Sequence, residues 1–152
     1  MAVSEVYYFA TDALVKVATE DPACIPLRLF FDRQAHVLTT RQCYQEAFRV
    51  FAQSQLVERK AEATFKSYFN KVEVVEVESE SVEVKKRMDT HSLDESSASL
   101  LAAIKREEAA ASEKNSEYFL VTNDGSLISA ARKEGIRFHD YSEEDFCAKY
   151  GA

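Results

Sequence analysis

The chain has 152 residues, of which 46% are hydrophobic and 30% charged, and its formal net charge is −7. With only three glycines and two prolines, this composition predicts one soluble globular domain over residues 1–152, without long flexible linkers. The odd number of cysteines without a Cys-x-x-Cys pair excludes a disulfide framework and a zinc site. The lack of a signal peptide or an apolar run of about 20 residues predicts a cytoplasmic protein outside the membrane.

The first predicted strand is Val6–Phe9, a β-prone and continuously apolar run of the kind that is buried on both faces of a sheet. A helix follows it, for which Thr11 or Asp12 can serve as the N-cap. The next predicted elements are a helix over 25–31, a strand at 36–38, a helix capped by Thr39 or Thr40, a helix over 57–69 and a strand over 72–77. The last of these has the clearest alternation of apolar and polar residues in the chain.

The second half of the chain continues the same alternation of elements. The segment 79–87 mixes valines with charges and stays ambiguous, whereas a long helix is predicted from Ser92 onward. Tyr118–Val121 is a second buried strand, and Asp124 is predicted to cap a helix that Gly135 ends. A strand at 136–138 and a helical tail over 142–150 complete the series. Strands that alternate with helices predict a three-layer α/β/α fold with a mainly parallel sheet of about four or five strands.

Two acidic residues directly follow predicted strands. Asp12 comes after the first strand and Asp124 after Tyr118–Val121. In open parallel sheets the functional crevice lies beyond the carboxyl ends of the strands, so both side chains are candidates for a site. Each also has a simpler interpretation as the N-cap of the helix that follows it.

Two further acids stand at unusual places on predicted helices. Glu46 lies on the apolar side of its helix, where a carboxylate is costly unless it is paired or bound to a cation. The alternative is that Glu46 reaches solvent at the edge of the apolar stripe or pairs with Arg41 or Arg49. Asp94 opens the long helix, a position that the helix dipole alone favours for an acid.

The segments around these acids together resemble the PIN-domain nuclease family, which includes the VapC-type toxins. The run Phe9-Ala10-Thr11-Asp12-Ala13-Leu14-Val15-Lys16 is similar to the family's first motif, hydrophobic-Asp-Thr-Ser/Asn-Ala-Leu. Glu46 matches the family's Glu on the helix after the second strand, and Asp94 matches its Asp at the start of a later helix. The strand that runs into Thr122-Asn123-Asp124 matches the last motif and is the most specific piece.

The chain departs from the family pattern at one position. The family's first acid would stand where this chain has Ala10, and Asp12 occupies the neighbouring Ser/Asn position. Side chains two residues apart in extended backbone point to the same side, so Asp12 is the candidate to reach the same pocket from a shifted position.

The resemblance implies a metal-dependent endoribonuclease in which Asp12, Glu46, Asp94 and Asp124 hold one or two Mg²⁺ or Mn²⁺ ions. Thr11, Thr122 and Asn123 are candidates to contact a bound phosphate. The family also implies a homodimer and, for a toxin, an antitoxin-like protein partner. A net charge of −7 argues against a general nucleic-acid binder, although an acidic site that works through metal ions is an exception. Ala10 keeps a second hypothesis open, a PIN-fold protein that binds RNA or a protein partner without cleaving.

Other residue types give weaker signals. His36, His91 and His139 lack metal-ligand spacing and are interpreted as surface or strand-end residues. Lys85-Lys86-Arg87 is the densest basic cluster, for which a solvated turn is a simpler interpretation than an RNA contact.

Overall fold

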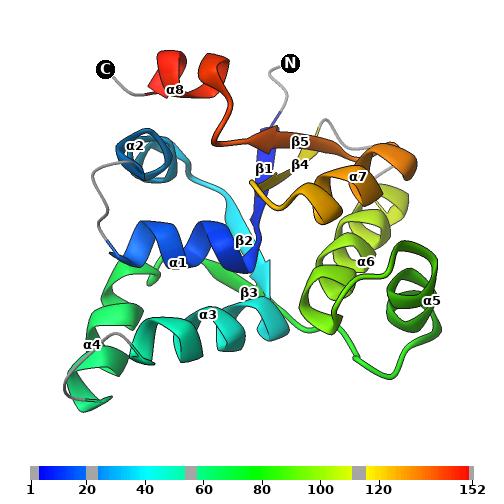
Figure 1. Cartoon of the computed structure of the whole chain (residues 1–152), viewed down its shortest axis with the longest axis horizontal. Coiled ribbons are helices and arrows are strands. Elements are labelled where there is room, and N and C mark those ends of the chain that lie inside the picture. Colours follow the sequence, from blue (N-terminus) through cyan, green and yellow to red (C-terminus); the bar gives the residue numbers. More distant parts are fainter. Residues whose placement is uncertain (1–3, 20–23, 54–57, 111–115, 151–152) are drawn as a thin grey trace.

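The structure is a computed structural model that describes residues 4–19, 24–53, 58–110 and 116–150, with the side chains of 58–60 left out (Figure 1). The strands within these residues are β1 (Ser4–Phe9), β2 (Val37–Thr40), β3 (Glu73–Val75), β4 (Ser116–Thr122) and β5 (Arg137–Asp140). The helices are α1 (Thr11–Thr19), α2 (Ile25–Arg33), α3 (Arg41–Gln53), α4 (Glu58–Tyr68), α5 (Val82–His91), α6 (Glu95–Ala110), α7 (Gly125–Lys133) and α8 (Glu144–Tyr150).

The five strands form one parallel sheet in the order β3-β2-β1-β4-β5. Helices α1, α2, α3, α4 and α8 lie on one side of this sheet, and α5, α6 and α7 lie on the other (Figure 1). The predicted three-layer α/β/α fold is therefore confirmed.

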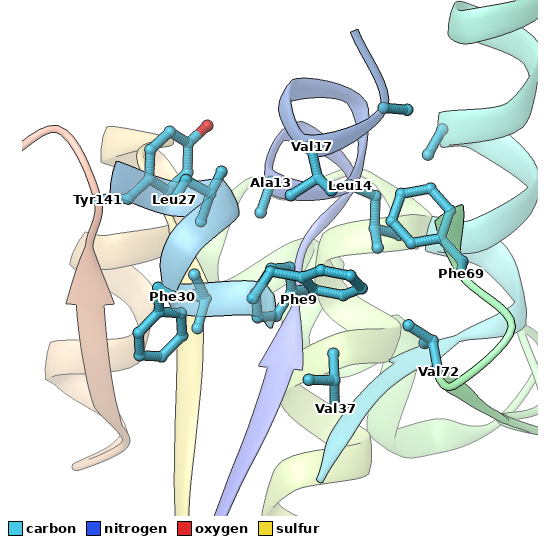
Figure 2. Close-up of a cluster of buried hydrophobic side chains, with 14 of the residues drawn as sticks. Phe9, Ala13, Leu14, Val17, Leu27, Phe30, Val37, Phe69, Val72 and Tyr141 are labelled. Carbon is cyan, nitrogen blue, oxygen red and sulfur yellow. The ribbon is translucent and has the colours of Figure 1, made fainter. Parts of the chain in front are cut away.

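The central strands are buried on both faces because neighbouring side chains point to opposite sides of the sheet. In β1, Tyr7 and Phe9 pack into the core beneath α1 and α2, whereas Tyr8 packs into the core beneath α6 and α7. In the first of these cores, side chains from the helices and strands surround Phe9, among them Leu14 and Phe30 (Figure 2). This two-sided burial fixes the position of the end of β1.

The strand predicted over 72–77 from its clear alternation is β3, the shortest strand of the sheet. Only Glu73–Val75 pairs, because β3 is an edge strand with β2 as its sole neighbour in the sheet. Beyond Val75, side chains of α3 hold the chain: Arg41 Nε donates to Glu76 Oε1 (2.7 Å) and Gln42 Nε2 to the carbonyl oxygen of Val77 (2.6 Å).

The ambiguous segment 79–87 contains the start of α5, which Ser81 caps by accepting a hydrogen bond from the backbone N–H of Val84. The basic cluster therefore lies on a helix, and its interpretation as a solvated turn was wrong. Arg87 is buried and forms an ion pair with Glu134 (2.8 Å). In the described part of the chain, no helix has the length and apolar character needed to cross a membrane.

Candidate functional site

The candidate site lies where the two central strands end. Phe9 at the end of β1 is in register with Val121 of β4, and the backbone N–H of Ala10 donates to the carbonyl oxygen of Val121 (3.1 Å). Helix α1 starts at Thr11, directly after this contact. The helix after β4 starts at Gly125, so both helices begin at the same edge of the sheet.

A pocket of about 300 Å³ opens at this edge. We call it the acid pocket, because all four predicted acids line it. Its lining residues are Ala10, Thr11, Asp12, Val15, Lys16, Glu46, Val50, Asp94, Ser97 and Asp124. The structure thus brings together side chains from α1, α3, the start of α6 and the residue before α7.

Both carboxylate oxygens of Asp12 accept hydrogen bonds. Its Oδ1 accepts a hydrogen bond from Thr122 Oγ1 (2.7 Å), and its Oδ2 accepts from the backbone N–H of Asn123 (2.9 Å) and from Tyr141 Oη (2.7 Å). Both oxygens therefore bind the segments that follow β4 and β5. Burial, followed by the Asp12 carboxylate, raises the pKa of Tyr141 above its ordinary value, so this hydroxyl keeps the proton that it donates. Asp12 therefore links the start of α1 to these two segments, and it lies within α1 rather than capping it.

Asp124 caps the start of α7 and also donates a hydrogen bond to the last residue of β4. It caps α7, as predicted, by accepting hydrogen bonds at Oδ1 from the backbone N–H groups of Ser126 (2.9 Å) and Leu127 (3.3 Å). Its own N–H donates to Thr122 Oγ1 (3.1 Å), and Thr122 is fully buried. Thr122 and the backbone of Asn123 therefore hold the segment before Asp124 against Asp12. The second carboxylate oxygen of Asp124, Oδ2, accepts no hydrogen bond from the described residues.

Asp94 and Glu46 complete the acidic lining. Asp94 Oδ1 accepts a hydrogen bond from the backbone N–H of Ser97 (2.8 Å), which caps the start of α6. Glu46 is half-buried, and within the described residues it accepts no hydrogen bond and forms no ion pair. The alternative pairing with Arg41 is excluded in this structure, because Arg41 binds Glu76 instead. Each of these two side chains has oxygen atoms left for a ligand.

The chemistry of this donor set suits a hard divalent cation, which prefers carboxylate oxygens. The side chains do not form a closed metal cage: in the described part of the chain, no group of three or more His, Cys, Asp or Glu side chains is gathered closely enough to hold a metal ion. Mg²⁺ commonly uses one or two carboxylates and completes its shell with waters and substrate phosphate oxygens. Two of the three acids Glu46, Asp94 and Asp124 would meet that requirement.

Comparison with known proteins establishes the fold. The chain is similar to the crystal structure of PAE2754 from Pyrobaculum aerophilum, with a TM-score of 0.59 and 17% sequence identity. The superposition covers 97% of this chain and 99% of that chain, so the two share the whole arrangement of layers. No family model and no curated protein matches the sequence.

Several residues around the site were not predicted from the sequence. Lys16 lines the acid pocket from α1, one helical turn after Asp12. Residues four apart lie on the same face of a helix, so the sequence could have placed Lys16 beside Asp12. Tyr141 left no such signal, because it meets Asp12 only through the pairing of β4 with β5. One histidine differs from its prediction as a surface or strand-end residue, because the side chain of His91 is only 8% exposed. His139 lies near the end of β5 and stacks on Phe119 of β4.

Proposed function

We propose that this chain is a metal-dependent endoribonuclease of the PIN type. The observation that carries the proposal is the convergence of Glu46, Asp94 and Asp124 on one pocket at the carboxyl ends of β1 and β4. Three of the four sequence motifs that resemble the PIN family contribute these acids. The shared pocket is what that resemblance leads one to expect, and it lies where parallel sheets place their ligands.

Asp124, Asp94 and Glu46 are the residues that would hold Mg²⁺ or Mn²⁺. When bound, such an ion lowers the pKa of a coordinated water and offsets negative charge on a phosphodiester. Lys16 lines the same pocket and supplies a positive charge that a substrate phosphate can approach. Asp12 acts indirectly, because its hydrogen bonds to Thr122 and Asn123 fix the loop that carries Asp124.

A second function, binding of RNA or a protein partner without cleavage, is favoured by Ala10. This residue is 2% exposed and lines the acid pocket, where the PIN motif would place a carboxylate. Asp12 stands two residues further on, and its two oxygens already accept three hydrogen bonds. The pocket thus holds its four acids with the first one two residues later than the motif implies.

Cleavage of a labelled structured RNA with Mn²⁺ or Mg²⁺ tests the proposal. We expect metal-dependent cutting that EDTA and Asp124→Ala both abolish, with Asp89→Ala, an exposed acid on α5, as the matched control. Mn²⁺ binding followed by calorimetry provides a separate readout. We expect weak binding to the chain alone and tighter binding when RNA is present, because phosphate oxygens complete the metal shell.

The Ala10→Asp variant separates the two functions. If the natural chain is silent and Ala10→Asp cleaves, the fold is that of a nuclease and the natural chain is a binding protein. If neither chain cleaves and neither binds Mn²⁺, the metal-dependent proposal is wrong.

The homodimer and the antitoxin-like partner are further parts of the proposal. Light scattering of the purified chain tests the first. Co-purification from the native host, followed by mass spectrometry of any small acidic or basic partner, tests the second.

A further inference from the structure

Helices α3 and α6 lie on opposite sides of the sheet, but each brings an acid to the acid pocket (Figure 1). Glu46 belongs to α3, and Asp94 directly precedes α6. The two helices meet where β2 ends, because Thr40 is the last residue of β2 and its side chain contacts α6. The contact at this point therefore determines how far Glu46 lies from Asp94.

Hydrogen bonds between buried groups make this contact. Thr40 Oγ1 accepts from the backbone N–H of Cys43 (3.3 Å) and lies 2.9 Å from Ser99 Oγ. Ser99 Oγ donates to the carbonyl oxygen of Ser96 (2.7 Å), and Cys43 Sγ donates to the same oxygen (3.3 Å). Thr40 and Ser99 are fully buried, Cys43 is 1% exposed and Ser96 is 7% exposed. The four residues therefore depend on one another for their hydrogen bonds.

The contacts also fix the direction of each hydrogen bond. A hydroxyl group has only one proton to donate, and Ser99 uses its proton on the Ser96 carbonyl. Thr40 must therefore be the donor in its contact with Ser99. The bonds run from the Cys43 N–H to Thr40, on to Ser99 and then to Ser96, where the Cys43 thiol closes the circle. We call these four residues the hydroxyl ring, in which each hydroxyl both donates and accepts.

The hydroxyl ring lies within one helical turn of each acid. Glu46 follows Cys43 by three residues on α3, so the two side chains lie on the same face of that helix. Asp94 precedes Ser96 by two residues, and its Oδ1 is fixed by the backbone N–H of Ser97. A buried polar network in which every group is paired holds its members in one arrangement. A shift of α3 against α6 would break this network and move one carboxylate relative to the other.

We propose that Thr40 and Ser99 are positioning residues that set the separation of Glu46 and Asp94 in the acid pocket. Neither hydroxyl residue lines the pocket, so both act through the two helices and not by touching a ligand. Metal ligands must be held at fixed distances, and the groups that orient them affect the affinity for the ion. The role of the carboxylates as metal ligands rests on the proposed function, whereas the effect of the ring on the helices does not.

Four variants test the ring. Thr40→Val replaces the hydroxyl with a methyl group of similar size, and Ser99→Ala breaks the ring from the side of α6. Thr40→Ser keeps the hydroxyl and should rescue what Thr40→Val loses. Ile104→Val shortens a fully buried side chain of α6 outside the ring and is the matched control. Urea unfolding should show a lower midpoint for Ile104→Val, as for Thr40→Val, because both variants disturb a buried position.

Residual dipolar couplings of the backbone amides in α3 and α6, measured by NMR without metal, test the ring directly. We expect Thr40→Val and Ser99→Ala to change the orientation of α3 relative to α6. Thr40→Ser and Ile104→Val should keep the orientation of the natural chain. Because no metal is added, this result is independent of the proposed nuclease function.

Titration with Mn²⁺, followed by the paramagnetic broadening of the Asp94 and Asp124 amide signals, tests the consequence for the acid pocket. We expect Thr40→Val and Ser99→Ala to weaken Mn²⁺ binding by roughly tenfold, the lower end of the effect known for groups that orient metal ligands. Thr40→Ser and Ile104→Val should bind Mn²⁺ as the natural chain does.

The outcomes separate the ring from the metal site. An unchanged helix orientation in Thr40→Val and Ser99→Ala, or Mn²⁺ affinity equal to that of the natural chain, overturns the positioning role and leaves the nuclease proposal standing. An equal loss of Mn²⁺ affinity in Ile104→Val also overturns it, because the ring would then act only through stability. A natural chain that binds no Mn²⁺ counts against the proposed function, whereas a changed helix orientation in that case still supports the ring as the link that fixes α3 against α6.

Discussion

Replacing Asp12 tests whether this carboxylate is a positioning residue or a metal ligand. In Asp12→Ala, three donors lose their acceptor: the hydroxyls of Thr122 and Tyr141 and the backbone N–H of Asn123. Asn123 is exposed and can donate to water, whereas Thr122 is fully buried and Tyr141 is 6% exposed. A hydrogen bond to a charged group contributes roughly 1.5–3 kcal/mol, so losing the two buried bonds should lower the free energy of unfolding by roughly 3–6 kcal/mol.

Asp12→Asn gives a graded version of the same test. The amide keeps one oxygen that accepts a hydrogen bond but loses the second acceptor and the charge. We expect a loss of roughly 1–3 kcal/mol, between the natural chain and Asp12→Ala. Urea unfolding followed by circular dichroism measures both values, and Asp89→Asn on the exposed face of α5 is the control that should change stability little.

The metal-ligand interpretation predicts the opposite pattern. Carboxylates that line one pocket repel one another, so removal of an unpaired one leaves stability unchanged or raises it while Mn²⁺ binding falls. An Asp12→Asn variant that unfolds at the same urea concentration as the natural chain, and has lost Mn²⁺ affinity, would refute our assignment of Asp12.

Three further predictions concern buried groups. Tyr8→Phe should stabilise the fold by about 1 kcal/mol, because the Tyr8 hydroxyl is buried without a partner among the described residues; a loss in urea unfolding would contradict this. Burial raises the pKa of Tyr7, Tyr8 and Tyr141, so the folded state holds these protons more tightly than the unfolded chain. The stability from them is complete below about pH 10 and falls above it; urea midpoints from pH 8 to 11 should decline, and less steeply in Tyr141→Phe. Burial also raises the pKa of the Cys43 thiol to about 11, so Ellman's reagent at pH 8 should label the half-buried Cys147 in the native chain and Cys43 only after unfolding.

The layers of the fold could be predicted because the signals for each strand and helix lie within short stretches of the sequence. The run Val6–Phe9 is apolar at every position, and the structure buries Tyr7 and Tyr8 on opposite faces of the sheet. The alternation of apolar and polar residues predicted a strand over 72–77, but only Glu73–Val75 forms one. Alternation indicates which side chains face the core, but it does not indicate how many neighbouring strands the segment can pair with. An edge strand with one neighbour ends where that neighbour ends, which here is Thr40 opposite Val75.

The site was predictable only in part. Asp124 was placed correctly as the cap of α7 because a strand, a turn and a helix start all lie within a few residues of it. The partners of Asp12 lie 110, 111 and 129 residues away in the sequence, so nothing near Asp12 indicates that its carboxylate is already bound. The same holds for His91, whose Nε2 contacts Glu134, 43 residues later.

The structure shows that capping a helix and binding a ligand need not be alternatives for Asp94 and Asp124. From the sequence, a helix cap and a ligand were alternatives for Asp94 and Asp124. In the fold each carboxylate uses Oδ1 for the cap, which leaves Oδ2 outside the hydrogen bonds of the described residues. The cap fixes the side chain in one orientation before any ligand arrives, and such pre-organisation lowers the entropy that binding costs. Capping and ligation are therefore compatible in these two residues, whereas in Asp12 both oxygens already accept hydrogen bonds, which leaves less of that carboxylate for a ligand.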